Sequence, residues 1–554
     1  MTTTLIRNGA LWSEGTRLDG DAVLIEDGRI SAIGPEGDLL QLLDGRSARI
    51  VDAEGGLVAP SFADAHVHAS FGGIEINSLD LSSATDAREC LELIREFAET
   101  CTAEWITGGG WEMPWFEGGT PTAEMLDTVT GSRPAFILNA DHHGAWVNTR
   151  ALEIAGISAN TADPVDGRLE RDARGVPSGT VHEGAQSLLA PFVPKATTAE
   201  VVEGIRRGAA VLNAAGVTAW QEALVGDYDS FVDCAPGYRA LIAEGHLTAR
   251  LSGALWVPRE TTISQVGAVV SDLVRRRALN AAAGFETSTA KIMIDGVAEN
   301  RTAALHDPYL VDGCTCGTER GIAYFGRDVL FALARELMDN GFSLHFHAIG
   351  DRAVTDALDA VEQIPAENRA GLRHHIAHVQ IVDPKDIERF RRLDVTVNAQ
   401  ALWACNEQQM TELTVPIIGE ARAAWQYPFG SFERAGADLA MGSDWPVSTY
   451  DPWQAIHVAV NRRAPGSDAP ALNPGEEITL ESALTAYTAG SHRLLGLPRS
   501  GMLAIGAEAD LCIADRDPFA APAEQIYLTR TRLTMLAGQI LQHKPSHPTE
   551  STSS

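Results

Sequence analysis

The middle of the chain alternates short apolar runs, typical of β-strands, with longer amphipathic segments that are typical of helices. Eight runs are candidate strands, at residues 61–68, 217–223, 249–257, 289–296, 343–350, 374–380, 395–400 and 438–444. Helical segments at residues 198–216, 326–341 and 352–364 lie between several of them. Eight strands with intervening helices predict an α/β fold, a TIM-like (β/α)8 barrel with parallel strands.

The first two candidate strands are separated by far more residues than a simple crossover needs. Residues about 73–200, which are rich in Trp, Gly and His, are therefore predicted to form a long insertion after the first strand. Segments that follow barrel strands lie at the C-terminal face of the barrel, where barrel enzymes carry their active sites. We expect the insertion to cover such a mouth.

Both ends of the chain have a different texture. Residues 1–58 and 500–545 consist of short strand-like runs separated by glycine-containing turns, among them Asn-Gly and Asp-Gly. We expect the two ends to join in one small β-domain, and residues 59–499 to form the barrel with its insertion. The polar residues 546–554 are predicted to be disordered.

Composition excludes some classes of partner. The formal net charge is −31 and there is no long basic run, which argues against nucleic acid or an anionic membrane surface as a partner. No apolar run reaches the ~18–20 residues that span a membrane, and the first residues lack the pattern of a signal peptide. The seven cysteines are scattered, and the lone C-x-C pair, Cys314 and Cys316, is a weak metal signal. These features predict a cytoplasmic protein.

Histidines recur at the ends of the candidate strands. Because strand side chains alternate between faces, His66 and His68 share a face, as do His345 with His347 and His374 with His378. In a barrel, the inward residue closer to the C-terminal strand end lies closer to the mouth, which favours His347 and His378 over their partners. Each histidine alone is more often a hydrogen-bonded core residue.

The joint pattern is more informative. His66, His68, His347, His378 and Asp444 come from four strands and are predicted to meet at one rim. Imidazole nitrogens together with a carboxylate suit zinc, and also iron or manganese. We expect one or two such ions at this rim.

Lys291 stands in a strongly apolar strand, just before its C-terminal end. Burial disfavours the ammonium form and lowers the pKa of a lysine, and a neutral lysine beside metal ions can take up carbon dioxide to give a bridging carbamate. We therefore expect Lys291 to be carbamylated and to bind metal. Asp295, on the same face, is the competing ligand, and a purely structural lysine is the third possibility.

These motifs resemble the amidohydrolase superfamily along nearly the whole chain. The quoted elements are "FADAHVH", "AKIMIDG", "HFHAIGDRAV", "HHIAHVQ", "MGSDWPV" and "GMLAIGAEADLCIADRDP". The forms "HAIGDRA" and "GSDWPV", with "DHHGAWVNTRAL" in the insertion, are similar to the YtcJ-like branch, amidohydrolase family 3. "KIMIDGVAENRTAAL" is similar to N-substituted formamide deformylases, and its "VAEN" departs from the "DGSLGSRTA"-like segment of other members.

The resemblance implies a barrel with a composite β-sandwich built from both chain ends. It also implies a homodimer and one or two metal ions, with ligands that match His66, His68, Lys291, His347, His378 and Asp444. The implied reaction is hydrolysis of a non-peptide C–N bond, in an amide or N-substituted formamide, by metal-activated water. Asp444 would be the general base that later protonates the leaving amine.

The substrate pocket is predicted from side chains near the mouth. Aromatic residues there suit an apolar or aromatic small-molecule substrate, although they can equally pack the insertion's own core. The candidate substrate-binding residues are Trp111, Trp115, His142, His143, Arg301, Trp403 and Trp445. His142 or His143 is a candidate oxyanion donor, and Arg301 a candidate carboxylate ligand or an ordinary salt-bridge residue.

Other functions on the same barrel stay open. A deaminase, a hydrolase of cyclic amides or esters, and a phosphotriesterase-like enzyme would all use a similar metal cluster. A non-catalytic metal-binding protein is the alternative from another class. The complete ligand set beside an open rim argues against it, because structural metal sites are closed.

Overall fold

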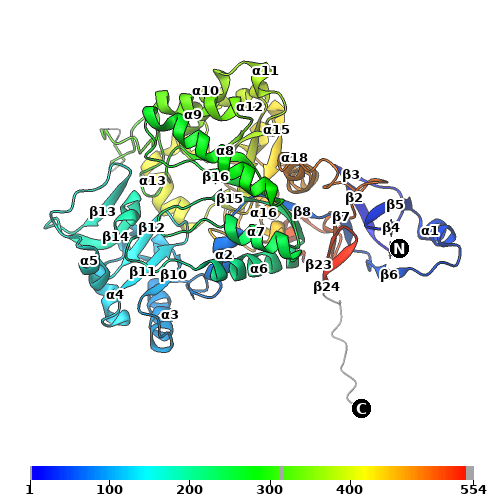
Figure 1. The fold of residues 1–554 in the computed structure, drawn as a ribbon, viewed down its shortest axis with the longest axis horizontal. Helices are drawn as coiled ribbons and strands as arrows, with labels where there is room; N and C mark the ends of the chain where they lie inside the picture. Colours follow the sequence, from blue (N-terminus) through cyan, green and yellow to red (C-terminus); the bar gives the residue numbers. More distant parts are fainter. Residues whose placement is uncertain (1–2, 312, 315, 544–554) are drawn as a thin grey trace, which may run out of the picture.

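The computed structural model describes residues 3–311, 313–314 and 316–543, and its centre is an eight-stranded parallel barrel (Figure 1). The strand order is β21-β20-β19-β18-β17-β16-β15-β8, so the chain visits the strands in sequence. The eight predicted strands are confirmed as β8 (Phe62–Val67), β15 (Val217–Val225), β16 (Arg250–Trp256), β17 (Glu286–Met293), β18 (Ser343–Ala348), β19 (His374–His378), β20 (Val395–Ala399) and β21 (Leu439–Met441).

The last strand returns to the first just beyond Met441. The backbone N–H of Asp444 donates to the carbonyl of His66 at 2.8 Å. Gly442 permits this approach, since a Cβ there would lie only 2.6 Å from the backbone nitrogen of His66. The residues that follow β21 are therefore held against the H-x-H segment of β8.

Helices cover the outside of the barrel. Their amphipathic sequences bury one face on the strands, and α6 begins with a capping box in which Thr197 and Glu200 bond to each other's backbone N–H. The helices of this part are α2 (Ala69–Glu75), α6 (Thr198–Ala214), α7 (Ala235–Glu244), α8 (Val266–Ala282), α9 (Arg327–Asp339), α10 (Asp351–Glu362), α11 (Ala366–Arg369), α12 (Ile387–Leu393), α13 (Val415–Ile418), α14 (Glu420–Ala423), α15 (Phe429–Ala435), α16 (Pro452–Asn461), α17 (Leu480–Thr485) and α18 (Ser491–Leu494).

The two chain ends meet in a β-domain on the right of Figure 1. One sheet has the order β5-β4-β1-β6, and the other, β24-β23-β22-β7-β2-β3, draws strands from both ends. The strands are β1 (Thr3–Arg7), β2 (Ala10–Ser13), β3 (Thr16–Arg17), β4 (Ala22–Glu26), β5 (Arg29–Gly34), β6 (Arg49–Asp52), β7 (Leu57–Pro60), β22 (Leu511–Ala514), β23 (Thr531–Leu536) and β24 (Gln539–His543), with helix α1 (Glu36–Leu43). Ile6, Val23, Leu511 and Met535 share one apolar core, so the ends of the chain fold together. The tail at 546–554 lies outside the described residues.

The segment between α2 and α6 forms a separate layer, drawn in cyan on the left of Figure 1. Its sheet has the order β13-β14-β12-β11-β10-β9 and an apolar core of its own, which includes Trp111 and Trp146. The elements are β9 (Leu79–Asp80), α3 (Ala87–Thr100), β10 (Ile106–Trp111), α4 (Ala123–Thr130), β11 (Ala135–Asn139), β12 (Gly144–Val147), α5 (Thr149–Ala155), β13 (Gly167–Arg171) and β14 (Pro177–Glu183). The predicted insertion is thus a folded unit.

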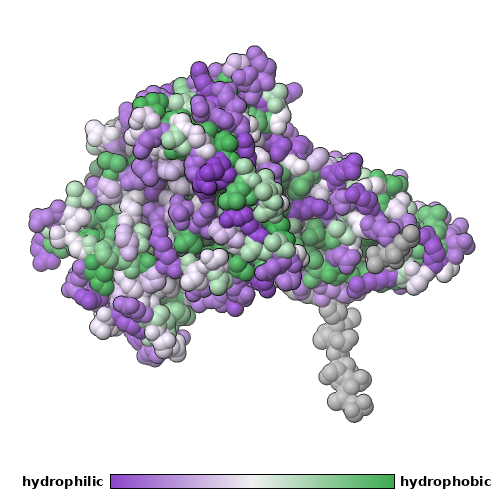
Figure 2. Space-filling model, viewed as in Figure 1, coloured by the Kyte–Doolittle hydropathy of each residue, from purple (hydrophilic) through white to green (hydrophobic). Residues whose placement is uncertain are grey.

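Polar and charged residues are spread over the face seen in Figure 2, with smaller apolar groups between them. In the described part of the chain, no helix combines the length and apolar character that crossing a bilayer requires. Six cysteines are free thiols there: Cys90, Cys101, Cys234, Cys314, Cys405 and Cys512.

Candidate metal centre and active-site cavity

Five of the six predicted ligands lie at the C-terminal ends of barrel strands, on one side of the barrel. His66 is in β8 and His68 directly follows it, His347 is in β18, His378 ends β19, and Asp444 follows β21. Asp444 Oδ1 lies 3.2 Å from Nε2 of His66 and 3.2 Å from Nε2 of His68. These three residues form a group able to hold a metal ion.

His378 and His347 complete this arrangement. His378 Nδ1 lies 3.9 Å from Asp444 Oδ2, and the ring centroids of His347 and His378 are 4.4 Å apart. Both ring nitrogens of His378 and Oδ1 of Asp444 are buried and have no hydrogen-bond partner among the described residues. An unsatisfied buried polar atom costs about 1–3 kcal/mol. A divalent cation would satisfy these atoms, so the donor set fits a metal ion.

The protonation states also suit metal binding. Burial lowers the pKa of His66 to about 3, and it lowers the pKa of His378 well below its ordinary value. Burial alone would raise the pKa of Asp444. Its contacts with His66 and His68 outweigh that effect and hold the pKa far below the usual range. At neutral pH the site therefore offers neutral imidazoles and an ionised carboxylate, which are the forms that bind metal ions.

A second layer of side chains lies behind the ligands. His345 Nε2 lies 2.9 Å from His66 Nδ1, so His66 keeps only its Nε2 free for a ligand. Lys291 Nζ lies 3.4 Å from the same nitrogen of His345, and Lys291 lines the cavity beside the ligands. Burial lowers the pKa of Lys291 to about 7. The lysine is thus partly neutral at physiological pH, as carbamate formation requires.

Asp295, the competing candidate ligand, contacts backbone N–H groups and His347. Its carboxylate accepts hydrogen bonds from the backbone N–H groups of Ala304, Ile349 and Gly350 at 2.8–3.0 Å. It also lies 3.4 Å from Nδ1 of His347. These contacts favour Lys291 over Asp295 as the metal ligand, because the oxygens of Asp295 face backbone donors and Nδ1 of His347. Asp295 orients that histidine instead.

Glu222, in β15, is a buried carboxyl group close to the metal centre. Ser70 donates to it through its backbone N–H and its hydroxyl, and the Tyr238 hydroxyl also donates. Burial raises the pKa of Glu222 from 4.5 to about 7. Between pH 4.5 and pH 7, Glu222 therefore holds a proton in the native state that it has lost in the unfolded chain. The stability that this group contributes at low pH is lost as the pH rises through 7.

We expect Glu222→Gln to remove this pH dependence. The amide can accept from the Ser70 N–H and donate to the Ser70 hydroxyl, as the protonated acid does. Relative to the wild type, the variant should gain on the order of 2 kcal/mol in stability between pH 5 and pH 8. Thermal unfolding midpoints at both pH values provide the measurement. Glu203→Gln, an exposed change on α6, is the control, and equal pH dependence in all three proteins would contradict the prediction.

The ligands open into a cavity of about 500 Å³ beneath the insertion. Among the predicted pocket residues, His142, His143 and Trp403 lie on its wall, and Trp403 stacks on His378 with ring centroids 5.4 Å apart. Four further carboxylates lie on the wall: Glu112, Asp141, Glu299 and Glu407. The sequence analysis missed the three glutamates. Lys291 is the only lysine or arginine on the wall within the described part of the chain. The wall is therefore rich in carboxyl groups away from the metal centre, and burial raises the pKa of its three glutamates.

The other predicted pocket residues lie elsewhere. Trp111 is fully buried in the insertion core and donates to the carbonyl of Ile137, and Trp115 packs against the same core. Trp445 packs on Gly72, and its carbonyl accepts from the His68 N–H. Arg301 donates to the carbonyl of Leu310. Arg301 also lies 3.9 Å from Glu319, the salt-bridge alternative of the sequence analysis. None of these four side chains lines the cavity.

Comparisons with known proteins agree with this geometry. The model of the amidohydrolase family matches residues 49–542. The putative amidohydrolase YtcJ of Bacillus subtilis is 29% identical over 96% of this chain and 97% of its own length. The N-substituted formamide deformylase of Arthrobacter pascens is 27% identical, and the match covers 90% of each chain. The structure of an uncharacterized metal-dependent hydrolase from Pyrococcus horikoshii has the same fold, with a TM-score of 0.70 at 23% identity over 94% of this chain and 99% of that one.

Proposed function

Since the chain belongs to the amidohydrolase family, we propose that it is a metal-dependent hydrolase of non-peptide C–N bonds in small molecules. N-substituted formamides are the leading substrate class. The observation that carries the proposal is the group of buried, unsatisfied imidazole and carboxylate atoms that opens into the cavity. His66, His68, Lys291, His347, His378 and Asp444 would hold one or two ions, with zinc the first choice and iron or manganese the alternatives.

When bound, the cation acts as a Lewis acid and lowers the pKa of water, which supplies hydroxide at neutral pH. Asp444 accepts the proton of the attacking water, because its carboxylate is ionised and faces the cavity. It then delivers that proton to the nitrogen of the leaving amine. If two ions bind, a carbamylated Lys291 would help to hold them, and the lowered pKa of Lys291 favours that modification.

The carboxyl groups on the cavity wall favour some substrates over others. An anionic substrate would approach the carboxyl groups of Glu112, Glu299 and Glu407, and none of the described residues on the wall is an arginine. A crystal structure of a Xaa-Pro dipeptidase shares the fold at a TM-score of 0.52. Among the described wall residues, the only basic side chains that a free peptide carboxylate could meet are Lys291 and histidines. Uncharged amides, with Trp403 against their apolar part, suit it better.

A substrate screen tests the proposal. We expect zinc-loaded protein to hydrolyse N-substituted formamides that carry a neutral aromatic substituent, and to prefer them at least tenfold in kcat/KM over N-formyl amino acids. Simple N-acyl amides, cyclic amides, esters and cyclic amidines complete the panel. Turnover of cyclic amidines or cyclic amides alone would move the assignment to the alternative, a deaminase or a cyclic amide or ester hydrolase.

The remaining proposals concern binding partners, assembly and location in the cell. We propose a small molecule as the only required partner, a homodimer as the assembly and the cytoplasm as the location. The net charge of −31 supports the absence of nucleic acid and anionic membranes from the list of partners.

A further inference from the structure

The insertion presents two adjacent histidines to the cavity, and each is paired with a glutamate. His142 Nε2 lies 3.3 Å from Glu75 Oε1. His143 Nδ1 lies 3.0 Å from both carboxylate oxygens of Glu183, the residue that ends β14. The two pairs differ in burial, because the side chain of Glu183 is fully buried whereas 23% of that of Glu75 is exposed.

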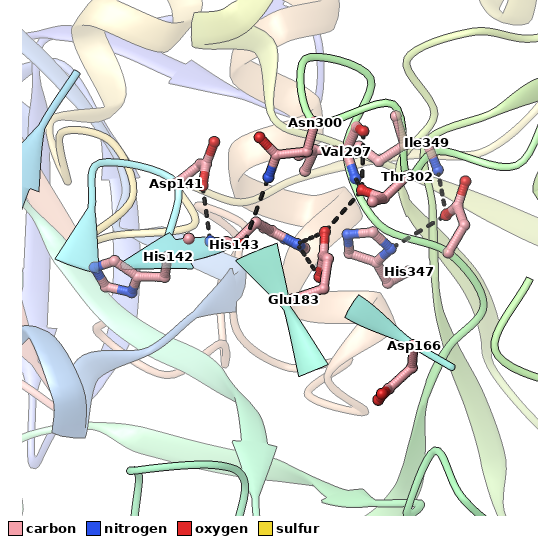
Figure 3. Close-up of polar contacts among 12 residues, drawn as sticks. Asp141, His142, His143, Asp166, Glu183, Val297, Asn300, Thr302, His347 and Ile349 are labelled. Carbon is pink, nitrogen blue, oxygen red and sulfur yellow. Dashed lines mark hydrogen bonds and ion pairs between the residues drawn. The ribbon is translucent and has the colours of Figure 1, made fainter. Parts of the chain in front are cut away.

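Glu183 is held firmly in its place. Its Oε1 accepts from the Thr302 hydroxyl at 2.8 Å (Figure 3). Its Oε2 lies 3.9 Å from a guanidinium nitrogen of Arg259. Gly296 makes room for the carboxylate, since a Cβ there would lie 2.3 Å from Glu183 Oε1. Glu183 itself has a φ of 52°, which is strained for a residue with a side chain. Three separate segments thus fix this carboxylate.

The backbone of His143 is fixed as well. Its carbonyl accepts from the N–H of Glu183 at 2.8 Å and from the Asn300 amide at 3.4 Å. The His143 ring lies beside that of His347, with centroids 5.5 Å apart, and His143 lines the cavity. With Nδ1 turned to Glu183, Nε2 is the ring nitrogen left for a bound molecule.

We propose that Glu183 is a positioning residue that holds His143 so that His143 Nε2 donates a hydrogen bond to the carbonyl oxygen of the substrate. This inference rests on the proposed amide hydrolysis, in which that oxygen gains negative charge as water attacks. The fully buried carboxylate of Glu183 lies 3.0 Å from Nδ1 of His143, closer than the 3.9 Å that separates it from Arg259. A His143 ring that balances this buried charge carries a proton on both nitrogens, and its Nε2 is then a hydrogen-bond donor.

The expected loss of kcat can be taken from enzymes in which one oxyanion donor was removed. Removal of one preorganised donor typically lowers kcat by about 10²- to 10³-fold. We therefore expect His143→Asn and Glu183→Gln each to lower kcat by about 10²-fold, with KM within a factor of about three, because the hydrogen bond strengthens only as charge develops. Affinity for a phosphonamidate analogue of the tetrahedral state should fall in parallel with kcat/KM, whereas affinity for the product amine should not change.

The decisive experiment is a double-mutant cycle on zinc-loaded protein. If Glu183 acts through His143, Glu183→Gln costs nothing further in the His143→Asn background. Glu170→Gln is the matched control. It breaks the 3.2 Å pair between Glu170 of β13 and His182, the neighbour of Glu183 in β14, away from the cavity wall. This change should leave kcat unchanged. Metal content, measured in every variant, should equal that of the wild type.

Two results would overturn the inference: an unchanged kcat in Glu183→Gln, or additive losses in the double variant. A wild type that is inactive on all amides and formamides would count against the proposed function instead. The cycle is then run with the carbonyl compound that the screen does identify, where additive losses still contradict the inference.

Discussion

Replacing Asp444 by asparagine should lower kcat/KM by about 10³- to 10⁴-fold. The carboxylate is within 3.2 Å of Nε2 of both His66 and His68, and the pKa of Asp444 lies far below its usual value. In the wild type, the carboxylate of Asp444 is thus ionised at neutral pH, and it lies where the predicted ligands meet the cavity. An amide of the same shape brings no negative charge and cannot accept a proton from water.

Metal analysis of the Asp444→Asn variant separates the two roles of this residue. If the variant keeps its zinc and loses kcat, the loss belongs to proton transfer, whereas a parallel loss of zinc belongs to coordination. Asp438→Asn is the matched control, since Asp438 directly precedes β21 and forms an exposed ion pair with Arg493. Asp444→Asn retaining more than a tenth of the wild-type kcat/KM would falsify the assignment of Asp444 as general base.

The barrel was predictable because its signal is repeated eight times. Each strand has its own apolar run, such as "VTAWQEALV", which is buried from end to end as β15. The insertion was predictable only as an interruption of this pattern. Its internal sheet depends on pairings such as that of β12 with β14, more than 30 residues apart in sequence, and local periodicity carries no information about such pairings.

Strand alternation placed His66, His68, His347 and His378 at one rim, because the faces of a strand are a local property. It did not reveal that His345 supports His66, or that Asp295 supports His347, since these contacts join different strands. The tryptophans show the same limit. Trp111 and Trp403 look alike in the sequence, yet one packs in the insertion core and the other lines the cavity. Only the tertiary structure decides which aromatic side chains face a substrate.

Removing the metal with a chelator should abolish hydrolysis while leaving the protein folded, and added zinc should restore the activity. The barrel core does not depend on the ions, because Phe62, Leu344 and Ile376 pack outside the ligand cluster. Stability should nevertheless fall, since stripping leaves both ring nitrogens of His378 and Oδ1 of Asp444 buried without partners. A cation that binds only the native state at a hundredfold excess over its Kd stabilises it by about 2.7 kcal/mol. Calorimetry with and without zinc measures this difference, and full activity in the stripped, folded protein would contradict the mechanism.

Mass and metal analysis can show whether Lys291 helps to bind a second ion. Its amine lies 3.4 Å from His345, behind His66, and its pKa of about 7 leaves much of it neutral and nucleophilic. If it carries a bridging carbamate, native mass spectrometry should show the added mass of one carbon dioxide, and Lys291→Met should lose that mass and one of two bound ions. If the site holds a single ion, the metal content of Lys291→Met should equal that of the wild type. Asp295 would be a poorer second ligand than a carbamylated Lys291, because its carboxylate already accepts three backbone hydrogen bonds.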